Sequence, residues 1–322
     1  MIRHPRAQGN GPYRPIESHA VRRLGWCATA ITILSILSVG ARAEQHQSDV
    51  PRSAAGRDDT ELETVLVEAQ RLRELQRQVS TFVSAITIHN RADSIARWHL
   101  PICPLVAGLP FGQGTFVFQR VSQVASEAGI PLGSEDCRPN LLVVMTGDPE
   151  ELIRGWWGNQ PRLFNKDRGV GGIERTIHTD APVRVFYNAC SIAAPGMPDN
   201  FAEGDLVCNG GGSPGSRLKR GAVRAIYSVI VVVDTRQTKA LELGALTDYV
   251  AMVALAQIRR SSDADPGNVP TILRLLDETD AERPRVMSRW DQAFLKSLYD
   301  IDPSNVVQRS QIQSAMVRDL AR

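Results

Sequence analysis

Apolar and polar positions along the chain repeat with two different periods, which separate predicted helices from predicted strands. Residues 61–88 place apolar side chains at helical spacing and charged side chains on the other face, which predicts an amphipathic helix. The nearly continuous apolar run 243–258 predicts a core helix. Further helices are predicted within 112–129, from Asp148 onward, and at 270–276, 288–299 and 305–320.

Three other segments have the pattern of strands. The uninterrupted apolar runs at 140–146 and 229–233 predict buried strands, and Val183–Tyr187 alternates as a strand does. We therefore expect an α+β fold, in which a mixed sheet lies between a helical N-terminal part and a helical C-terminal third. The polar residues 44–60 predict a flexible leader, and residues 61–322 a single domain.

The first 43 residues have the pattern of a secretory signal peptide. Arg22-Arg23 precedes an apolar run from Leu24 to Val39, and Ala41-Arg42-Ala43 supplies a cleavage site. The run is shorter than the roughly 20 apolar residues of a membrane span. We expect cleavage before Glu44, a periplasmic or secreted protein, and no stable membrane span after cleavage. Retention of residues 1–43 as an anchor is the alternative.

Removal of the leader changes the charge of the chain. The leader holds six of the 37 basic residues and one of the 35 acidic residues, so residues 44–322 carry 31 basic against 34 acidic residues and a net charge of −3. No basic field remains to attract nucleic acid. A nucleic-acid partner is therefore not expected.

Four cysteines follow the leader, namely Cys103, Cys137, Cys190 and Cys208. An even number of cysteines in an exported protein favours disulfides over metal ligation or thiol catalysis. Three connectivities are open. Pairing of neighbours, Cys103 with Cys137 and Cys190 with Cys208, closes the shortest loops and is the one that we predict. Cys103 is expected in a turn, which would tie the helical N-terminal part to the sheet.

Two motifs of the chain lack the chemistry that their letters suggest. Gly211-Gly212-Ser213-Pro214-Gly215 has the letters of a nucleophile elbow, but the oxyanion donor should be the N–H after the serine, and Pro214 has none. The histidines after the leader, His46, His89, His99 and His178, lack the spacing of a zinc site. We therefore predict no metal and no other cofactor.

Asp248 is the one weak candidate for a catalytic group, because it lies inside the most apolar predicted helix. A buried carboxylate needs hydrogen bonds or a cationic partner. The structural alternative is that Thr247 caps the helix and that Asp248 lies in its first turn, where the helix dipole favours a negative charge. A hydrolase with a carboxylate or serine site near Asp248 is the second functional hypothesis.

The chain contains the segments Val67–Arg71, Ile102–Leu109, Cys137–Asn140, Val183–Asn188 and Leu246–Val253. These segments resemble a family of exported, uncharacterised proteins from alphaproteobacteria, and the similarity covers roughly residues 60–320. The resemblance supplies no activity.

The C-terminal order of apolar strand, core helix, loop and Trp290–Tyr299 is similar to that of zincin-like peptidase relatives. The core helix of zincins reads H-E-x-x-H-x-x-G-L. In this chain Thr247 stands at the first histidine, Asp248 at the glutamate, Ala251 at the second histidine and Ala254-Leu255 at the Gly-Leu. The resemblance therefore implies a degenerate zincin-like scaffold without zinc ligands and without peptidase chemistry.

Together these features favour an exported α+β protein that binds a partner or serves as an envelope accessory factor, rather than a metalloenzyme. An envelope protein is the expected kind of partner. The sequence identifies no ligand or substrate.

Overall fold

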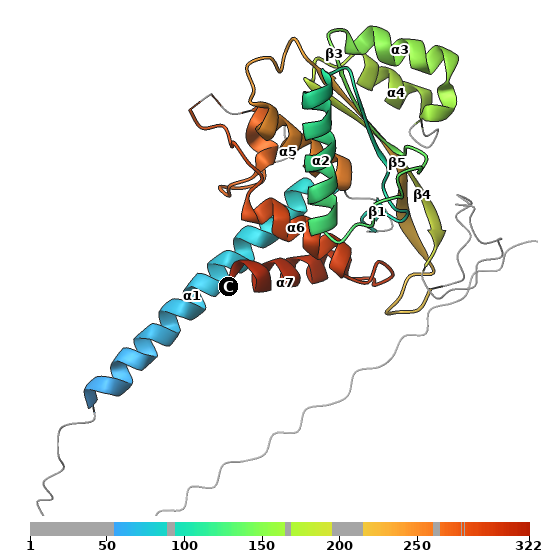
Figure 1. Cartoon of the computed structure of the whole chain (residues 1–322). Helices are drawn as coiled ribbons and strands as arrows, with labels where there is room; N and C mark the ends of the chain where they lie inside the picture. The colour runs from blue at the N-terminus through green and yellow to red at the C-terminus, as the bar shows by residue number, and fades with distance from the viewer. Residues whose placement is uncertain are drawn as a thin grey trace, which may run out of the picture. The chain divides into compact units, whose positions relative to one another are not determined.

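The computed structural model describes residues 55–88, 94–164, 169–194, 215–259, 265–277, 279 and 281–322. Contacts group Ala55–Arg322 into one unit (Figure 1). The predicted signal peptide at 1–43 and residues 44–54 of the predicted leader lie outside the described residues. Residues 55–60 of that leader are helical instead. Within the described part of the chain, no helix is both long and apolar enough to cross a membrane.

A five-stranded mixed sheet is built around one long strand, β5 (Ala222–Asp234). Strand β4 (Val183–Ala193) runs antiparallel along one edge of β5. The other edge is shared by two parallel strands, since β1 (Arg97–Trp98) pairs with the start of β5 and β3 (Leu141–Thr146) with its end. Strand β2 (Pro104–Ala107) pairs in parallel with β3. The predicted α+β fold with a mixed sheet is confirmed.

Alternate residues of β3 and β5 point to opposite faces of the sheet, and helices cover both faces. Val143 and Val231, which are register partners, belong to the larger core on the first face. Ile230, together with Phe186 of β4, belongs to a smaller core on the second face. The first face carries α2 (Phe111–Glu127) and α5 (Leu243–Leu255), and the second carries α3 (Pro149–Asn159), the short 3₁₀ helix η1 (Pro161–Leu163) and α4 (Gly169–Ile177).

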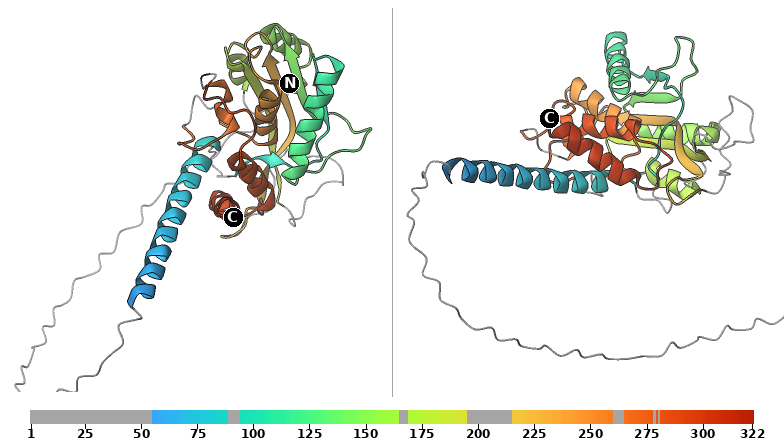
Figure 2. Two further views of the ribbon diagram at one scale, coloured as in Figure 1. Left: turned by 60° about the vertical axis from the view of Figure 1, so that its left-hand side comes forward. Right: turned by 90° about the horizontal axis from the view of Figure 1, so that it is seen from below.

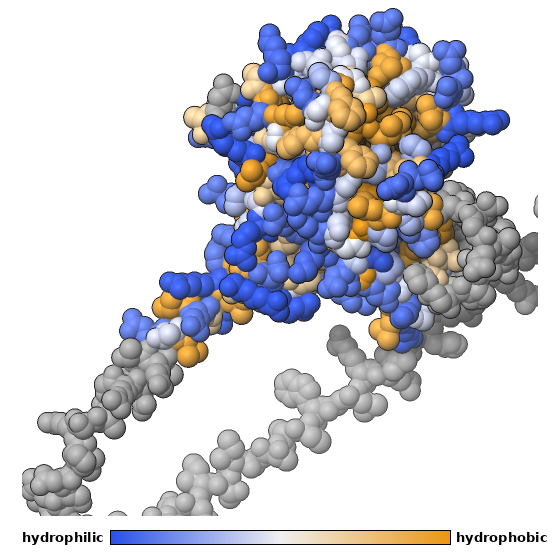
Figure 3. Space-filling model, in the orientation of Figure 1, coloured by the Kyte–Doolittle hydropathy of each residue, from blue (hydrophilic) through white to orange (hydrophobic). Residues whose placement is uncertain are grey.

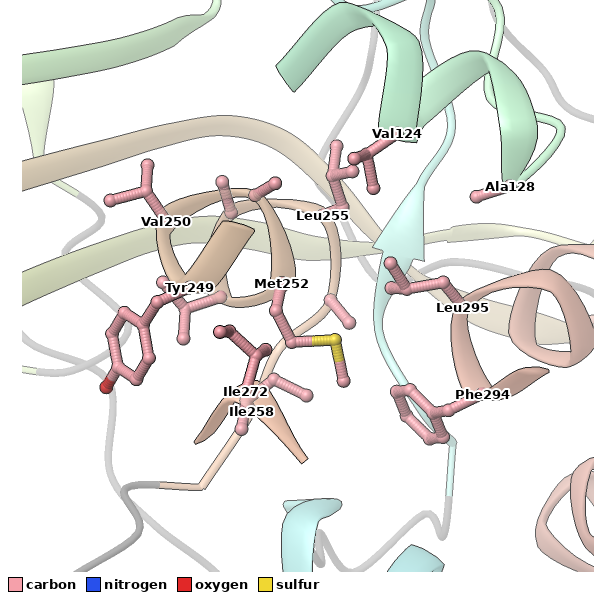
Figure 4. Packing of buried hydrophobic residues seen from close by; sticks show 14 of the residues in the cluster. Val124, Ala128, Tyr249, Val250, Met252, Leu255, Ile258, Ile272, Phe294 and Leu295 are labelled. Carbon is pink, nitrogen blue, oxygen red and sulfur yellow. The ribbon is translucent and has the colours of Figure 1, made fainter. Parts of the chain in front are cut away.

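Helix α5 lies at the centre of the larger core. Every residue from Ala245 to Leu255 is buried, because the sheet, α2, the 3₁₀ helix η4 (Ile272–Leu276) and α6 (Arg289–Asp300) surround the helix. Figure 4 shows Met252 of α5 pointing toward α6 with η4 beside it. The predicted core helix is present, although it ends at Leu255 rather than at residue 258.

Asp291 connects α6 to η4. Its carboxylate accepts a hydrogen bond from the backbone N–H of Ser288 (2.9 Å), and the Asp291 N–H donates to the Ser288 hydroxyl oxygen (3.2 Å), which together form the predicted capping box. The carboxylate also accepts from the Thr271 hydroxyl (2.6 Å) and the Ile272 N–H (2.9 Å). Burial raises the pKa of Asp291, and these hydrogen bonds oppose the rise. The helix predicted at 270–276 is therefore a short 3₁₀ helix held by this carboxylate.

The N-terminal and C-terminal helices lie against each other. Helix α1 (Ala55–Ile86) begins six residues before the predicted start at residue 61, and α7 (Gln308–Leu320) packs along it. Only the C-terminal half of α1 enters the core, where the ring of Phe82 contacts Trp290 and Phe294 edge to face. The N-terminal half extends away from the other elements, as two views show (Figure 2).

The disulfide between Cys103 and Cys137 joins the starts of two neighbouring strands. Cys103 directly precedes β2 instead of lying in a turn, so the bridge joins two strands of the sheet and does not tie the helical N-terminal part to it. That prediction was wrong because β1 and β2 are too short to give a periodic pattern. The predicted pairing is confirmed for these two residues. Cys190 is disulfide-bonded as well. Its predicted partner Cys208 lies outside the described residues, so that pair stays a prediction.

We expect Cys103→Ser to lower the free energy of unfolding by about 3–4 kcal/mol, because the crosslink restricts the 34-residue loop in the unfolded chain. Differential scanning calorimetry under oxidising conditions should show a melting temperature lower by roughly 10 °C. Cys190→Ser should lower it less. Equal melting temperatures for wild type and Cys103→Ser would contradict this role of the disulfide.

Candidate functional site

Asp248, the predicted candidate, lies in the second turn of α5 with a side chain that is only 3% exposed. Arg120 of α2 binds it with two hydrogen bonds, from Nε to Oδ1 (2.6 Å) and from Nη2 to Oδ2 (3.1 Å). The backbone N–H of Met287, which precedes α6, donates a third to Oδ2 (2.7 Å). The carboxylate therefore connects α2, α5 and the chain before α6.

The prediction that Thr247 caps the helix and that Asp248 lies in its first turn is wrong. Helix α5 begins at Leu243 and not at Thr247, and the Thr247 hydroxyl donates to the carbonyl of Leu243 (2.6 Å) instead of capping the helix. Asp248 thus lies beyond the first turn, and its charge is balanced by Arg120. The hydrogen bond to Asp248 raises the pKa of Arg120, so this partner stays charged.

The residues at the zincin ligand positions do not form a metal centre. Thr247 and Ala251 are fully buried, the hydroxyl of Thr247 is engaged with the backbone, and an alanine has no ligand atom. In the described part of the chain, no group of three or more His, Cys, Asp or Glu residues could hold a metal ion. Both oxygens of Asp248 accept hydrogen bonds from the protein, which leaves the carboxylate poorly placed to activate water.

The two described histidines, His99 and His178, lie on different elements, and the remaining candidate residues are almost all outside the described residues. His178 contacts Glu150 through Nδ1 (3.1 Å) on an exposed surface, whereas His99 follows β1. Burial lowers the pKa of His99, and the nearby charge of Arg97 lowers it further. Residues outside the described part are His46, His89, Cys208 and four of the five residues of the Gly211–Gly215 motif.

Helix α2 carries an exposed aromatic stripe that the sequence analysis missed. The chain turns from β2 toward α2 at Gly108, where φ is 84° and a Cβ would lie 1.9 Å from the carbonyl oxygen of Met145. Phe111 opens the helix and is 91% exposed, and Phe118, two turns later, is 43% exposed. Figure 3 shows apolar residues gathered where α2 begins.

Gly114 lies between these two rings on the same side of α2, at spacings of three and four residues. We call Phe111, Gly114 and Phe118 the aromatic stripe. A Cβ at Gly114 would have nothing within 4 Å, and its φ is not in the left-handed range, so the fold does not require a glycine here. A glycine inside a helix costs about 1 kcal/mol relative to alanine. The stability of the free protein therefore does not explain why a glycine lies between the two rings.

The stripe was missed because the helical pattern alone placed Phe116 with the buried side chains of α2. In the structure Phe116 is 42% exposed, while Val117, Val121 and Val124 form the buried side. Arg120 leaves α2 toward α5, and Phe118, two positions earlier, lies about 200° away around the helix. The rings of the stripe therefore lie on the flank of α2 that is turned away from α5.

Comparisons with known proteins give no relative. No family model, no curated protein and no solved structure matches the chain.

Arg120→Met should destabilise the protein by about 3 kcal/mol, because it leaves the Asp248 carboxylate buried without its cation. This loss of stability is at the low end of what removing one partner of a buried ion pair causes, since the Arg120 side chain is 26% exposed. Gln123→Met is the matched control, because Gln123 contacts Arg120 without carrying charge (3.2 Å). Urea unfolding that gives the two variants the same stability would refute the pairing.

Proposed function

We propose that the chain is a non-catalytic binding protein of the bacterial envelope, built on a degenerate peptidase-like scaffold, and that it captures an envelope protein through the aromatic stripe of α2. The observation that carries this proposal is the exposure of Phe111 and Phe118 on either side of a glycine that the fold does not need. Exposed aromatic side chains are typical anchors of protein interfaces. A glycine between them lets a partner's backbone approach the helix closely.

The environment of Asp248 supports a function without catalysis. A catalytic carboxylate must be free to take up or release a proton next to a substrate. Asp248 is 2% exposed and receives three hydrogen bonds, two of them from Arg120. The residue that stands at the catalytic glutamate of the zincin pattern is thus occupied in holding helices together.

The order of elements supports the scaffold part of the proposal. Strand β5 leads into the core helix α5, and a connecting segment that contains η4 leads from there to α6 with Trp290 in its first turn. This is the order on which the resemblance to zincin-like relatives rests. Similarity of scaffold says nothing of activity by itself, and the proposed function rests on the site instead.

Two features support the location in the envelope. The first is the leader-like sequence at residues 1–43, and the second is the Cys103–Cys137 disulfide, a bond that persists in oxidising compartments such as the periplasm.

The double variant Phe111→Ser/Phe118→Ser should reduce capture of an envelope protein at least tenfold, which corresponds to about 1.4 kcal/mol of binding energy. Immobilised wild type and variant would be exposed to the same envelope extract, and the captured protein quantified by mass spectrometry. Phe116→Ser is the matched control, since it removes a ring of similar exposure from the other flank. Capture that is equal for all three proteins would contradict the proposal, as would hydrolysis of ester, peptide or glycoside substrates by the purified protein.

Gly114→Ala separates stability from binding. We expect the variant to be more stable than wild type by roughly 0.5–1 kcal/mol, because alanine is the better helix residue and the added methyl group meets no neighbour. We expect it to capture the partner more weakly, because the methyl group stands where the partner approaches. Thermal unfolding and the capture assay measure the two effects, and unchanged capture by a stabilised variant would argue against the stripe.

A further inference from the structure

A cavity of about 280 Å³ lies where the C-terminal ends of α2 and α7 meet α6. Its floor is apolar, because the cavity is lined by Val124, Ala128, Met287 and Leu295, each at most 6% exposed. Figure 4 shows Val124 and Ala128 on the side of α2 that faces Leu295 of α6. Pockets for small molecules usually measure about 300–1,000 Å³, so this cavity suits a small ligand.

The rim of the cavity is polar and is formed by Glu127, Gln292, Lys296 and Asp319. Within the described part of the chain, the side chain of Gln292 makes no hydrogen bond to the protein, and Lys296 and Asp319 are 4.0 Å apart, too far for one. Glu127 accepts a single hydrogen bond, from Nε2 of Gln123 to Oε1 (2.8 Å). Polar groups with hydrogen-bonding capacity to spare therefore converge on an apolar floor, as they do in small-molecule sites.

The charges of the rim are arranged against the helix dipoles. Glu127 is the last residue of α2, and Asp319 is the last but one of α7. The C-terminal end of a helix carries about half a negative elementary charge, which makes it an unfavourable place for a carboxylate. With Lys296 the three charged side chains of the rim sum to −1, and the two helix ends add to this negative potential. The stability of the free helices does not explain these two carboxylates, whereas a cation in the cavity would compensate both.

Two basic side chains near Glu127 have other partners. Lys296 lies beside Asp319. Arg120, two turns before Glu127 on α2, donates to both oxygens of Asp248 and to the side chain of Gln123 (3.2 Å). Gln123 in turn holds the Glu127 carboxylate. Glu127 is thus held in place at the rim by a neutral amide and keeps its other oxygen for a ligand.

We propose that this cavity binds a small organic cation, a primary ammonium group on a short apolar chain. The ammonium donates to Glu127, and the chain lies on Val124, Ala128 and Leu295. The negative rim selects the charge, and the small apolar floor selects the size of the chain. The inference is independent of the proposed function, since the cavity lies at the other end of α2 from the aromatic stripe and takes a small molecule.

Isopentylamine and isopentyl alcohol test the ligand class, because they share one carbon chain and differ in the ammonium group. Each would be titrated into the purified exported protein with labelled methyl groups, and the resonances of Val124 and Leu295 followed by NMR. We expect a dissociation constant of about 1 mM or lower for the amine and at least tenfold weaker binding of the alcohol. No shift of these methyl groups at ten times that amine concentration, or equal affinity for the two compounds, would overturn the proposal.

Two charge variants test the role of the rim. Glu127→Gln should weaken binding of isopentylamine at least tenfold and leave the alcohol unaffected, whereas Lys296→Met should strengthen binding of the amine about threefold by removing a competing cation. Glu174→Gln is the matched control, because it removes an exposed carboxylate of α4 that does not line the cavity. Circular dichroism checks that all variants are folded. Unchanged affinity of Glu127→Gln, or weaker binding by Lys296→Met, would contradict a site for a cation.

Discussion

A carboxylate inside an apolar helix costs several kcal/mol unless a cation and hydrogen bonds compensate its lost hydration. Helix α5 has such a carboxylate at Asp248 and is nevertheless buried from Ala245 to Leu255. Arg120 supplies the cation from α2, and the N–H of Met287 supplies a further donor. The Asp248 carboxylate therefore links α2 and the chain before α6 to α5, in addition to the apolar contacts among these elements.

Asp248 holds three segments of the chain together, and both of its carboxylate oxygens are engaged in doing so. Exposed apolar residues lie elsewhere, on the outer flank of α2 and on the projecting half of α1. Neither surface contributes to the central core, so each is free to be used for binding without loss of the fold.

The parts of the fold that local patterns specify could be predicted from the sequence. The strand at 141–146, the helix at 243–255 and the capping box of Ser288 all depend on residues that are close in sequence. Strands β1 and β2, with two and four residues, are too short for a periodic pattern and form through pairing with distant strands.

The candidate site was less predictable, because its geometry comes from residues that are distant in sequence. Arg120 lies 128 positions from Asp248, so no spacing rule could have paired them. The aromatic stripe was within reach, since the spacing of Phe111, Gly114 and Phe118 is visible in the sequence. The pattern shows only that one flank of the helix carries aromatic residues, and exposure depends on what else packs there.

The central claim is that Asp248 serves the fold through Arg120. The most direct test is a double-mutant cycle that measures the unfolding free energies of Arg120→Met, Asp248→Leu and the variant with both substitutions. We expect the double variant to be more stable, by at least about 1 kcal/mol, than the sum of the single losses implies, because no unpaired charge is left buried. Additive losses would show that the two residues act separately, and would contradict the claim.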